Sequence, residues 1–428
     1  MSASVAETAG EFVRELPEWF ARAKLGVFIH WGAYSVPAWA ESVVENGTVS
    51  DEAYFPHNPY AEWYWNTMSI EGSPAAEWHR KEHGGAPYDD FLDAWRAEEF
   101  DPEEWAALFA RAGADYVIPT AKHHDGITLW NAPGTGGRNT VARGPQRDLV
   151  GDLAGAVRHA GMRFGVYYSG GIDWHVLPPR PILTHPELYA SRPMDAAYHR
   201  YATAHVRDLI RRFRPDVLWN DIDWPDAGKT PGPDGVDGLF RHYYEQVPDG
   251  VVNDRWGVRH ADFLTSEYES LRDRETAGKP WEHTRGLGLS FGHNRAEDPA
   301  SMLSAGGLAR HWVDVVARGG RLLINVGPTA SGRIPDEQRE ALEGFGAWRA
   351  ALGDAPAEVI AWADPADAFG PGGGPWLRFW NTAEAVIVFV GDPGAHDIRL
   401  PNGATLSVVI DTVAECPVIL SVPKEATR

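Results

Sequence analysis

The chain has a single cysteine, Cys416, among its 428 residues. A disulfide within the chain and a metal or iron–sulfur site built on several thiolates are therefore excluded. Basic residues are also scarce, because 39 Lys and Arg stand against 60 Asp and Glu, which gives a net charge of −21. The few lysines never form a run. Nucleic acids and anionic membranes need positively charged surfaces, so the composition predicts neither of them as a partner.

Long apolar runs are missing as well. No stretch approaches the roughly 20 apolar residues of a membrane-spanning helix. Residues 1–15 are polar and lack the apolar core of a signal peptide, so we expect a soluble, cytoplasmic protein. Aromatic residues, by contrast, are abundant, with 19 Trp and an aromatic content of 11%. This excess suits sugar binding, because aromatic rings pack against the C–H faces of pyranoses, although the same residues also serve to fill a protein core.

One pattern recurs over the first 330 residues: an amphipathic helix, a glycine, and an apolar run that ends in polar residues. The clearest copy begins at Asp101, which can cap a helix whose apolar residues keep helical spacing until Gly113. A buried strand follows and ends in the sequence Lys-His-His-Asp-Gly. The predicted strands of this kind lie at residues 25–29, 116–120, 164–168, 217–221, 251–255, 263–267 and 322–325.

Near-continuous apolar strands are typical of a parallel sheet that helices cover on both faces. Seven or more of them, with polar residues at their carboxyl ends, predict a (β/α)8-like (TIM-type) barrel whose catalytic residues gather at that rim. A doubly wound sheet is the rival, but it usually has a glycine-rich phosphate loop after its first strand, and the turn after His30 has none. The barrel is therefore the predicted fold.

The last part of the chain has a different pattern. Short alternating segments follow a Gly- and Pro-rich stretch and are separated by turn signals, which predicts a small C-terminal antiparallel β-sandwich. We therefore expect a catalytic barrel over residues 1–353 and the β-sandwich over residues 354–428. The expected strands of the sandwich are residues 377–380, 386–390, 398–400, 406–410 and 418–422.

Acidic side chains at the predicted strand ends are candidates for chemistry. Asp221 and Asp223 are spaced to share one face of a strand end, and Glu267 ends a different strand. Glycosidic cleavage needs such a pair: one carboxylate attacks or stabilises the anomeric carbon, and a carboxylic acid protonates the leaving oxygen. Carboxylates are common at barrel rims, so the spacing alone leaves a structural role open for each of them.

The sequence His123-His124-Asp125 is a candidate metal site. Adjacent residues of a strand point to opposite faces, so the two histidines could not bind one ion without a bend. Neither an H-x-H at the first strand nor an H-E-x-x-H motif is present. We therefore predict no metal and no cofactor, and expect the two imidazoles to form hydrogen bonds with the hydroxyls of a sugar.

Short motifs spread in order over essentially the whole chain add a more specific signal. They are Lys24–Gly32, Tyr34–Trp39, Glu62–Tyr64, Ala121–Gly126, Phe164–Ser169, Pro215–Asp221, Asn253–Gly257, Thr265–Tyr268, Trp281–Gly286, Leu289–Gly292 and Leu322–Pro328. Together they resemble the motifs of the α-L-fucosidases of glycoside hydrolase family 29. The resemblance implies hydrolysis of terminal α-L-fucosides with retention of configuration, through a covalent fucosyl-enzyme. The implied partner is a fucosylated oligosaccharide or glycoside.

The resemblance also implies roles for individual residues. The nucleophile falls on Asp221 and the acid/base on Glu267, with Glu282 as the competing candidate for the acid/base. The predicted substrate-binding residues are His30, Glu62, Trp63, His123, His124, Tyr167, Trp219, Arg255, Phe291 and Phe28. Fucose has a methyl group in place of a C6 hydroxyl, and Phe28 and Phe291 are the candidates for the apolar wall that this methyl needs. Asp223 matches no catalytic residue of the family.

Electrostatics should hold the two catalytic pKa values apart. Arg255 is expected to favour the charged form of Asp221, while partial burial would favour protonated Glu267. Two other functions stay open from the sequence: a related retaining glycosidase for sugars of the L-galactose configuration, and a catalytically silent carbohydrate-binding barrel. The oligomeric state is also open, a homo-oligomer included.

Overall fold

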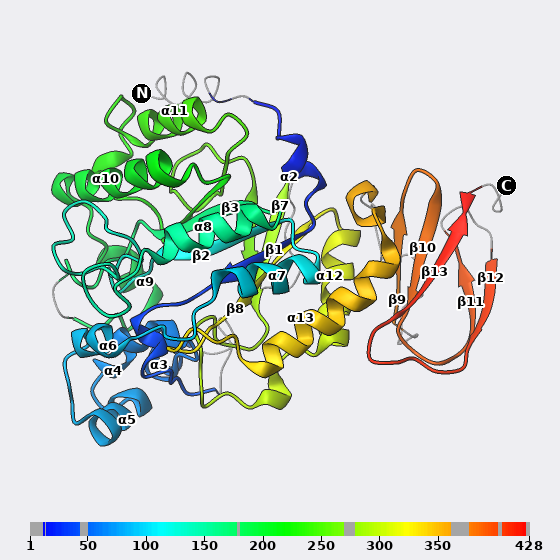
Figure 1. Ribbon diagram of the computed structural model, residues 1–428, viewed down its shortest axis with the longest axis horizontal. Helices are drawn as coiled ribbons and strands as arrows, with labels where there is room; N and C mark the ends of the chain where they lie inside the picture. The colour runs from blue at the N-terminus through cyan, green and yellow to red at the C-terminus, as the bar shows by residue number, and fades with distance from the viewer. Residues whose placement is uncertain are drawn as a thin grey trace.

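The computed structural model describes residues 12, 14–42, 50–177, 180–268, 279–360, 376–400 and 405–424. Its centre is a curled sheet of parallel strands in the order β5-β4-β3-β2-β1-β8-β7-β6. The strands are β1 (Leu25–Ile29), β2 (Tyr116–Lys122), β3 (Arg163–Ser169), β4 (Val217–Asp221), β5 (Val251–Val252), β6 (Leu264–Glu267), β7 (Trp281–Gly286) and β8 (Arg321–Val326). The (β/α)8-like barrel is thus confirmed (Figure 1).

Strands β5 and β6 lie at the two edges of the sheet, and hydrogen bonds to Asp262, two residues before β6, link β5 to that side. Val252 at the end of β5 accepts a backbone hydrogen bond from Asp262 at 3.0 Å and donates its own N–H to the Asp262 carboxylate at 2.8 Å. Strand β5 is shorter than predicted because Asn253 leaves the ladder. The Asn253 side chain instead pairs with both backbone groups of Asn220 on β4, at 3.0 and 2.9 Å, so the end of β4 keeps its hydrogen bonds.

Strand β7 was not predicted, because its sequence Trp-Glu-His-Thr-Arg-Gly has no apolar run. Glu282, His283 and Thr284 are nevertheless buried, and the first two find polar partners on other strands. His283 lies 2.9 Å from the hydroxyl of Ser266 on β6, and Glu282 accepts hydrogen bonds from two aromatic side chains inside the barrel. Paired polar groups therefore replace apolar ones in this strand.

Helices surround the sheet, and their ends follow the sequence signals. The Asp101 carboxylate accepts the N–H of Glu104 at 3.0 Å at the start of α7, and Gly113 ends that helix with φ +82°. The helices are α2 (Glu18–Arg22), α3 (Asp51–Tyr54), α4 (Tyr64–Met68), α5 (Pro74–His83), α6 (Asp89–Ala94), α7 (Pro102–Ala112), α8 (Leu149–His159), α9 (His185–Ala190), α10 (Ala196–Phe213), α11 (Val236–Gln246), α12 (Ala305–Ala317) and α13 (Asp336–Arg349). Short 3₁₀ helices are η1 (Ala33–Ser35), η2 (Phe55–His57), η3 (Ala61–Trp63), η4 (Asp226–Gly228), η5 (Pro299–Ser301), η6 (Ala350–Leu352) and η7 (Ala355–Glu358).

Among the described helices, none combines the length and the apolar character that crossing a membrane requires.

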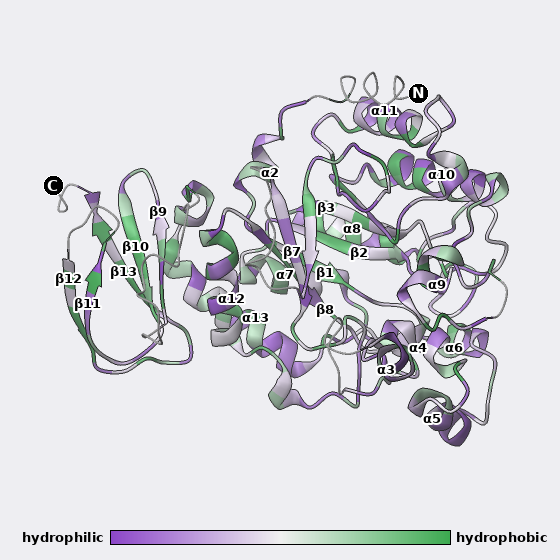
Figure 2. Cartoon of the chain, turned by 180° about the vertical axis from the view of Figure 1, so that it is seen from behind, coloured by the Kyte–Doolittle hydropathy of each residue, from purple (hydrophilic) through white to green (hydrophobic). Residues whose placement is uncertain are grey.

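Apolar residues pack in two layers around the strands. One large cluster fills the space between the sheet and the surrounding helices, and hydropathy colouring shows the central strands rich in hydrophobic residues while the peripheral helix α5 is mostly hydrophilic (Figure 2). A second cluster, which includes Phe28, Tyr167 and Trp219, gathers side chains from the strands themselves. These three aromatic residues also line the pocket described below, so they form its floor.

The C-terminal residues form two small antiparallel sheets beside α12 and α13 (Figure 1). One has the order β13-β10-β9, and the other pairs β11 with β12. The strands are β9 (Leu377–Asn381), β10 (Ala385–Val390), β11 (Gly394–Arg399), β12 (Thr405–Ile410) and β13 (Val418–Pro423). Trp380 of β9 packs on Trp312 of α12 at 5.0 Å and donates a hydrogen bond to the Val313 carbonyl at 3.2 Å. The predicted β-sandwich is confirmed, and it packs against the barrel.

Candidate active site

A pocket of about 840 Å³ opens at the carboxyl ends of the strands. All of the residues that the sequence predicts for catalysis and sugar binding line it, although they are spread from the first strand to the connection after β7. They are Phe28, His30, Glu62, Trp63, His123, His124, Tyr167, Trp219, Asp221, Arg255, Glu267 and Phe291. The barrel therefore brings the predicted set together at one rim, as expected for catalytic residues on this fold.

Arg255 connects the two predicted catalytic carboxylates. Its Nη1 donates to Asp221 Oδ1 at 2.9 Å, and its Nη2 donates to Glu267 Oε2 at 2.8 Å. Asp221 accepts a further hydrogen bond through Oδ2, from the Tyr167 hydroxyl at 2.8 Å. One guanidinium thus places the carboxylates of β4 and β6 side by side. Arg255 also lies over the Trp219 ring, 4.7 Å from its centroid.

The surroundings of Asp221 favour its charged form. Burial by itself would raise the pKa of this carboxyl, but the positive charge of Arg255 and the hydrogen bonds to the carboxylate outweigh burial. The pKa of Asp221 is consequently lower than usual, and the side chain is ionised near neutral pH. An ionised carboxylate at the floor of a concave pocket is suited to attack an electrophilic carbon.

Glu282 lies inside the barrel and is not among the residues that line the pocket. Its Oε1 accepts the indole N–H of Trp219 at 2.9 Å, and its Oε2 accepts the Tyr116 hydroxyl. Burial raises the pKa of this carboxyl above its usual range. Because Trp219 stacks on Tyr167 and lies under Arg255, Glu282 positions the aromatic floor of the pocket. Of the two candidates for the acid/base, only Glu267 lines the pocket.

His30 is held as a neutral ring with one defined tautomer. The Asn325 amide donates through Nδ2 to the Phe291 carbonyl at 2.6 Å, so its Oδ1 faces the His30 Nδ1 at 2.7 Å. The proton of His30 therefore lies on Nδ1, and Nε2 keeps a lone pair. Burial lowers the pKa of His30 to about 4. Asn325 was not predicted as a site residue, although its place near the end of β8 was a signal that could have found it.

His124 is fixed in the same way. The Ser169 hydroxyl donates to the Ile172 carbonyl at 2.8 Å and accepts from His124 Nδ1 at 2.7 Å. Burial lowers the pKa of His124 to about 3, so Nε2 is again an acceptor. Ser169, the last residue of β3, is a second positioning residue that the sequence analysis missed.

The rings of His123 and His124 lie only 4.0 Å apart, and both line the pocket. The expectation that these neighbours point to opposite faces was wrong, because β2 already ends at Lys122. The chain then turns, and Gly126 N–H donates to the His123 carbonyl at 3.1 Å. In the part of the chain that the structure describes, no three His, Cys, Asp or Glu side chains are grouped as metal ligands would be.

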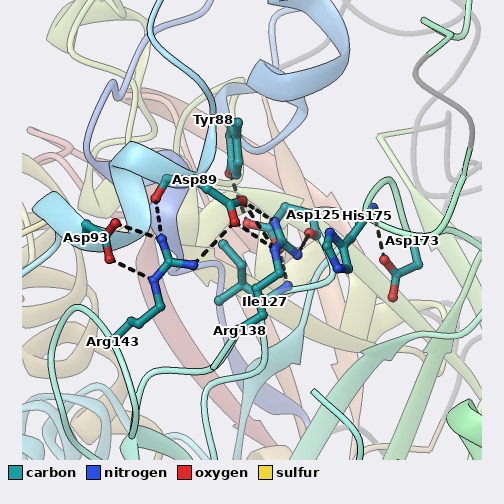
Figure 3. A network of polar contacts seen from close by, with 9 residues as sticks. All are labelled: Tyr88, Asp89, Asp93, Asp125, Ile127, Arg138, Arg143, Asp173 and His175. Carbon is teal, nitrogen blue, oxygen red and sulfur yellow. Dashed lines mark hydrogen bonds and ion pairs between the residues drawn. The ribbon is translucent and has the colours of Figure 1, made fainter. Parts of the chain in front are cut away.

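Asp125 belongs to this turn and is held by a network of polar contacts (Figure 3). Its carboxylate accepts the Tyr88 hydroxyl at 2.9 Å, and its carbonyl accepts from Arg138 Nη1 at 2.7 Å. Asp89 in turn pairs with Arg138 at 2.7 Å and with Arg143 at 3.3 Å. The network fixes the segment that presents the two histidines, and it accounts for Asp125 as a structural residue.

Glu62 and Trp63 lie on η3, in the connection between β1 and β2. The Glu62 carboxylate accepts the Gly292 N–H at 2.7 Å and the Ser290 hydroxyl at 3.4 Å. These bonds join that connection to the one after β7, where Phe291 lies. Burial raises the pKa of Glu62 to about 7, so this group is poised between its protonated and charged forms at neutral pH.

Asp223 lines the rim of the pocket but has cationic partners of its own. Its carboxylate forms ion pairs with Arg192 at 2.8 Å and Lys229 at 2.6 Å, and it accepts the Trp224 N–H at 2.7 Å. These contacts fix the turn after β4, where Ile222 and Asp223 both have positive φ. Asp223 thus holds the loop beside Asp221.

A barrel whose rim presents a bridged pair of carboxylates, with neutral imidazoles and aromatic rings around them, defines a glycoside hydrolase. A family model described as alpha-L-fucosidase matches residues 3–354. The chain belongs to this family, glycoside hydrolase family 29. The resemblance seen in the sequence motifs is thereby confirmed.

Characterised relatives and solved structures agree with this assignment. The alpha-L-fucosidase of Dictyostelium discoideum is 30% identical and covers 97% of this chain and 87% of its own length, and the tissue alpha-L-fucosidase of Rattus norvegicus is 33% identical over 80% of this chain and 70% of its own. A solved alpha-L-fucosidase superposes with a TM-score of 0.86 at 45% identity, covering 98% of this chain and 96% of the other. The structure of an alpha-L-fucosynthase of Thermotoga maritima, in complex with alpha-L-Fuc-(1-2)-beta-L-Fuc-N3, superposes with a TM-score of 0.83 at 45% identity. The match covers 96% of this chain and 94% of the other.

Proposed function

We propose that this enzyme hydrolyses terminal α-L-fucosides with retention of configuration, with Asp221 as the nucleophile and Glu267 as the acid/base. The observation that supports the assignment most strongly is the bridge of Arg255 between the two carboxylates. Retaining glycosidases need two carboxyl groups only about 5–5.5 Å apart. A shared guanidinium brings two carboxylates into this kind of proximity.

In the first step, Asp221 attacks the anomeric carbon while Glu267 gives a proton to the glycosidic oxygen. The bond between carbon and that oxygen breaks, the leaving group departs as an alcohol, and an ester to Asp221 forms. A carboxylic acid that accepts the Arg255 N–H through one oxygen can still donate a proton through the other. The low pKa of Asp221 keeps the nucleophile charged until it attacks.

In the second step, Glu267 acts as a base. The negative charge of Asp221 is consumed in the ester, so Arg255 then faces a single carboxyl group. This favours the carboxylate form of Glu267, which removes a proton from the water that attacks the anomeric carbon. The water oxygen forms the new bond, Asp221 leaves as a carboxylate, and fucose is released in its original configuration.

The surrounding residues suit a fucosyl ring. The free Nε2 atoms of His30 and His124 can accept hydrogen bonds from sugar hydroxyls, and Glu62 can do the same when charged. The ring centroids of Phe28 and Phe291 lie 4.7 and 4.9 Å from that of His30, and the two rings supply an apolar surface for the methyl group. An L-galactoside would place a hydroxyl there instead, at the cost of burying it without a partner.

The proposal is tested with Asp221→Gly. We expect this variant to lose nearly all turnover, and azide to restore part of it by entering the space of the lost carboxylate, which gives a fucosyl azide of inverted β configuration. Asp223→Gly is the matched control, because it removes a carboxylate from the same loop that is already paired with two cations. An active Asp221→Gly variant together with an inactive Asp223→Gly variant would contradict the assignment.

We also infer that the chain divides near residue 353 into the catalytic barrel and the β-sandwich. The family match ends at residue 354, and the antiparallel strands follow from Leu377 onward. These two boundaries support a break between α13 and β9.

A further inference from the structure

Lys122 is a fully buried lysine that the proposed mechanism does not use. It is the last residue of β2 and directly precedes the two histidines of the pocket, yet it is not among the residues that line that pocket. A charged side chain is rarely buried completely unless it has partners. The partners of Lys122 therefore indicate what its charge does in the interior.

A bulge at the end of β2 turns this side chain away from the pocket. Thr120 lies opposite Tyr167 on β3 and Lys122 lies opposite Tyr168, so β2 has one extra residue between the two pairs. Strict alternation would instead send Lys122 to the same side as Thr120. The Lys122 ammonium lies over the Tyr168 ring, 4.8 Å from its centroid, and donates to the hydroxyl of Tyr198 on α10 at 3.0 Å. The side chain is thus directed toward the helices that cover the sheet.

The ammonium also binds the connection that follows β3. Lys122 Nζ donates to the Asp173 carboxylate at 3.0 Å and to the Ile172 carbonyl at 3.4 Å. Asp173 is itself buried, and its Oδ1 accepts the His175 N–H at 3.1 Å (Figure 3). The buried ion pair therefore fixes the start of this connection on the end of β2.

The same connection holds His124. The Ile172 carbonyl that faces Lys122 also accepts the Ser169 hydroxyl, which in turn accepts from His124 Nδ1. The Trp174 N–H donates to the His124 carbonyl at 2.8 Å, and the Trp174 ring meets the imidazole edge-on with centroids 5.5 Å apart. Both the backbone and the ring of His124 are therefore held by a segment that Lys122 holds in turn.

The turn after β2 fits tightly against this segment. Gly126 has φ +73°, and a Cβ at this position would lie 2.3 Å from Asp173 Oδ1. Glycine is therefore required both for the backbone conformation and for the approach of the carboxylate. The ion pair lies where the two connections meet, so a shift of Asp173 would be passed on to the turn that presents the histidines.

The charge of Lys122 has a further effect on the histidines. Burial lowers the pKa of His123 and of His124, and the nearby ammonium lowers both further. Burial also lowers the pKa of Lys122, but the Asp173 carboxylate opposes this. A charged Lys122 favours neutral imidazoles, and a neutral ring is what acceptance of a sugar hydroxyl by Nε2 requires.

From these contacts, and building on the proposed function, we propose that Lys122 is a positioning residue for His124. Its ammonium fixes residues 172–174, and these hold His124 with Nε2 free to accept a hydrogen bond from one hydroxyl of the fucosyl ring. Lys122 acts through the histidine and does not touch the substrate. Loss of the ammonium should therefore remove the recognition of a single hydroxyl and leave the rest of the site in place.

The test compares several sugars on two variants of the ion pair. Lys122→Met keeps the length of the side chain without its charge. Lys122→Met/Asp173→Asn also removes the carboxylate, so no unpaired charge is left in the interior, and this variant serves where the single one does not fold. The probes are L-fucose and its 2-, 3- and 4-deoxy derivatives, each measured as a competitive inhibitor of the hydrolysis of an aryl α-L-fucoside.

We expect inhibition by L-fucose to weaken about tenfold in both variants, which corresponds to the loss of about 1.4 kcal/mol of binding. One deoxy sugar, the one that lacks the hydroxyl bound by His124, should inhibit the wild type and both variants within twofold of each other. Ser169→Ala should single out the same deoxy sugar, because it interrupts the same path at the imidazole. Circular dichroism should show the fold of the wild type in every variant.

Tyr198→Phe is the matched control, because it removes one partner of the ammonium and leaves the ion pair with Asp173 in place. It should change inhibition by none of the sugars more than twofold. Equal weakening of all four sugars in the ion-pair variants is what a merely structural role predicts and would overturn the proposal. Unchanged inhibition by L-fucose, or a double variant that does not fold, would also overturn it, and so would a different deoxy sugar singled out by Ser169→Ala.

The wild type separates this proposal from the proposed function. A wild type that hydrolyses no aryl α-L-fucoside and binds no L-fucose would refute the proposed function itself. A wild type that does both, with variants that fail the comparison above, would refute only the role of Lys122.

Discussion

Replacing Tyr167 by Phe removes one of the hydrogen bonds that hold Asp221 in its charged form. The hydroxyl donates to Asp221 Oδ2 at 2.8 Å, and the side chain is 1% exposed. Phe keeps the ring that stacks on Trp219 with centroids 5.5 Å apart. The substitution therefore removes a single donor and leaves the packing of the pocket floor in place.

The expected size of the effect follows from the charge of the acceptor. A hydrogen bond to a charged group contributes about 1.5–3 kcal/mol, and one pKa unit corresponds to about 1.36 kcal/mol. The pKa of Asp221 should therefore rise by roughly one to two units, still opposed by Arg255. Asp221 is a nucleophile only when it is ionised, at pH values above its pKa. A higher pKa therefore lowers activity on the acid side of the pH profile and affects the plateau near neutral pH much less.

The assay is kcat/KM on an aryl α-L-fucoside between pH 3.5 and 8, because this ratio reports the ionisation of the free enzyme. We expect the acid limb of Tyr167→Phe to move upward by at least one unit. Tyr168→Phe is the control: the neighbouring hydroxyl lies 3.0 Å from His205 and does not contact Asp221. A limb that stays in place for Tyr167→Phe, or moves equally for both variants, would refute the reasoning.

Three further predictions concern polar groups of the site. Because burial raises the pKa of Glu62 from 4.5 to about 7, the folded protein keeps a proton that the unfolded chain releases, and the free energy of unfolding should fall by roughly 3 kcal/mol as the pH rises through this window. Denaturant unfolding measures the free energy of unfolding at pH 5 and at pH 8, and the difference between the two values should be smaller for Glu62→Gln than for the wild type. An equal difference in the two proteins would contradict the prediction. Asn325→Ala removes the partner of His30 Nδ1 and should weaken inhibition by fucose about tenfold; an unchanged inhibition constant would argue against the assigned tautomer. Glu267→Ala should slow the hydrolysis of natural fucosides far more than that of aryl fucosides. Azide should accelerate turnover by this variant and give the fucosyl azide of retained α configuration. Glu282→Gln should show neither effect, and the reverse pattern would make Glu282 the acid/base.

The barrel could be predicted because most of its strands are covered on both faces. Continuous apolar runs such as residues 116–120 follow directly from that burial, and the polar residues that end them fall on the rim. This is why the predicted site residues all line one pocket. Strand β7 escaped prediction because buried polar residues occupy it, and the partner of one of them, Glu282, is Trp219, 63 residues away.

The finer arrangement of the site depends on contacts that a sequence does not display. Both His123 and His124 reach the pocket only because β2 ends just before them. The tautomers of the neutral histidines depend on Asn325 and Ser169, which come from other strands.

The identity of the nucleophile is the central claim, and covalent labelling tests it most directly. A 2-deoxy-2-fluoro-fucosyl fluoride slows both chemical steps, but its good leaving group lets the first step occur, so the ester accumulates. Digestion of the labelled protein and mass spectrometry of the peptides should place one fucosyl group on Asp221, and Asp221→Gly should take up none. A label on Asp223 or Glu267, or inactivation without any covalent label, would contradict the account.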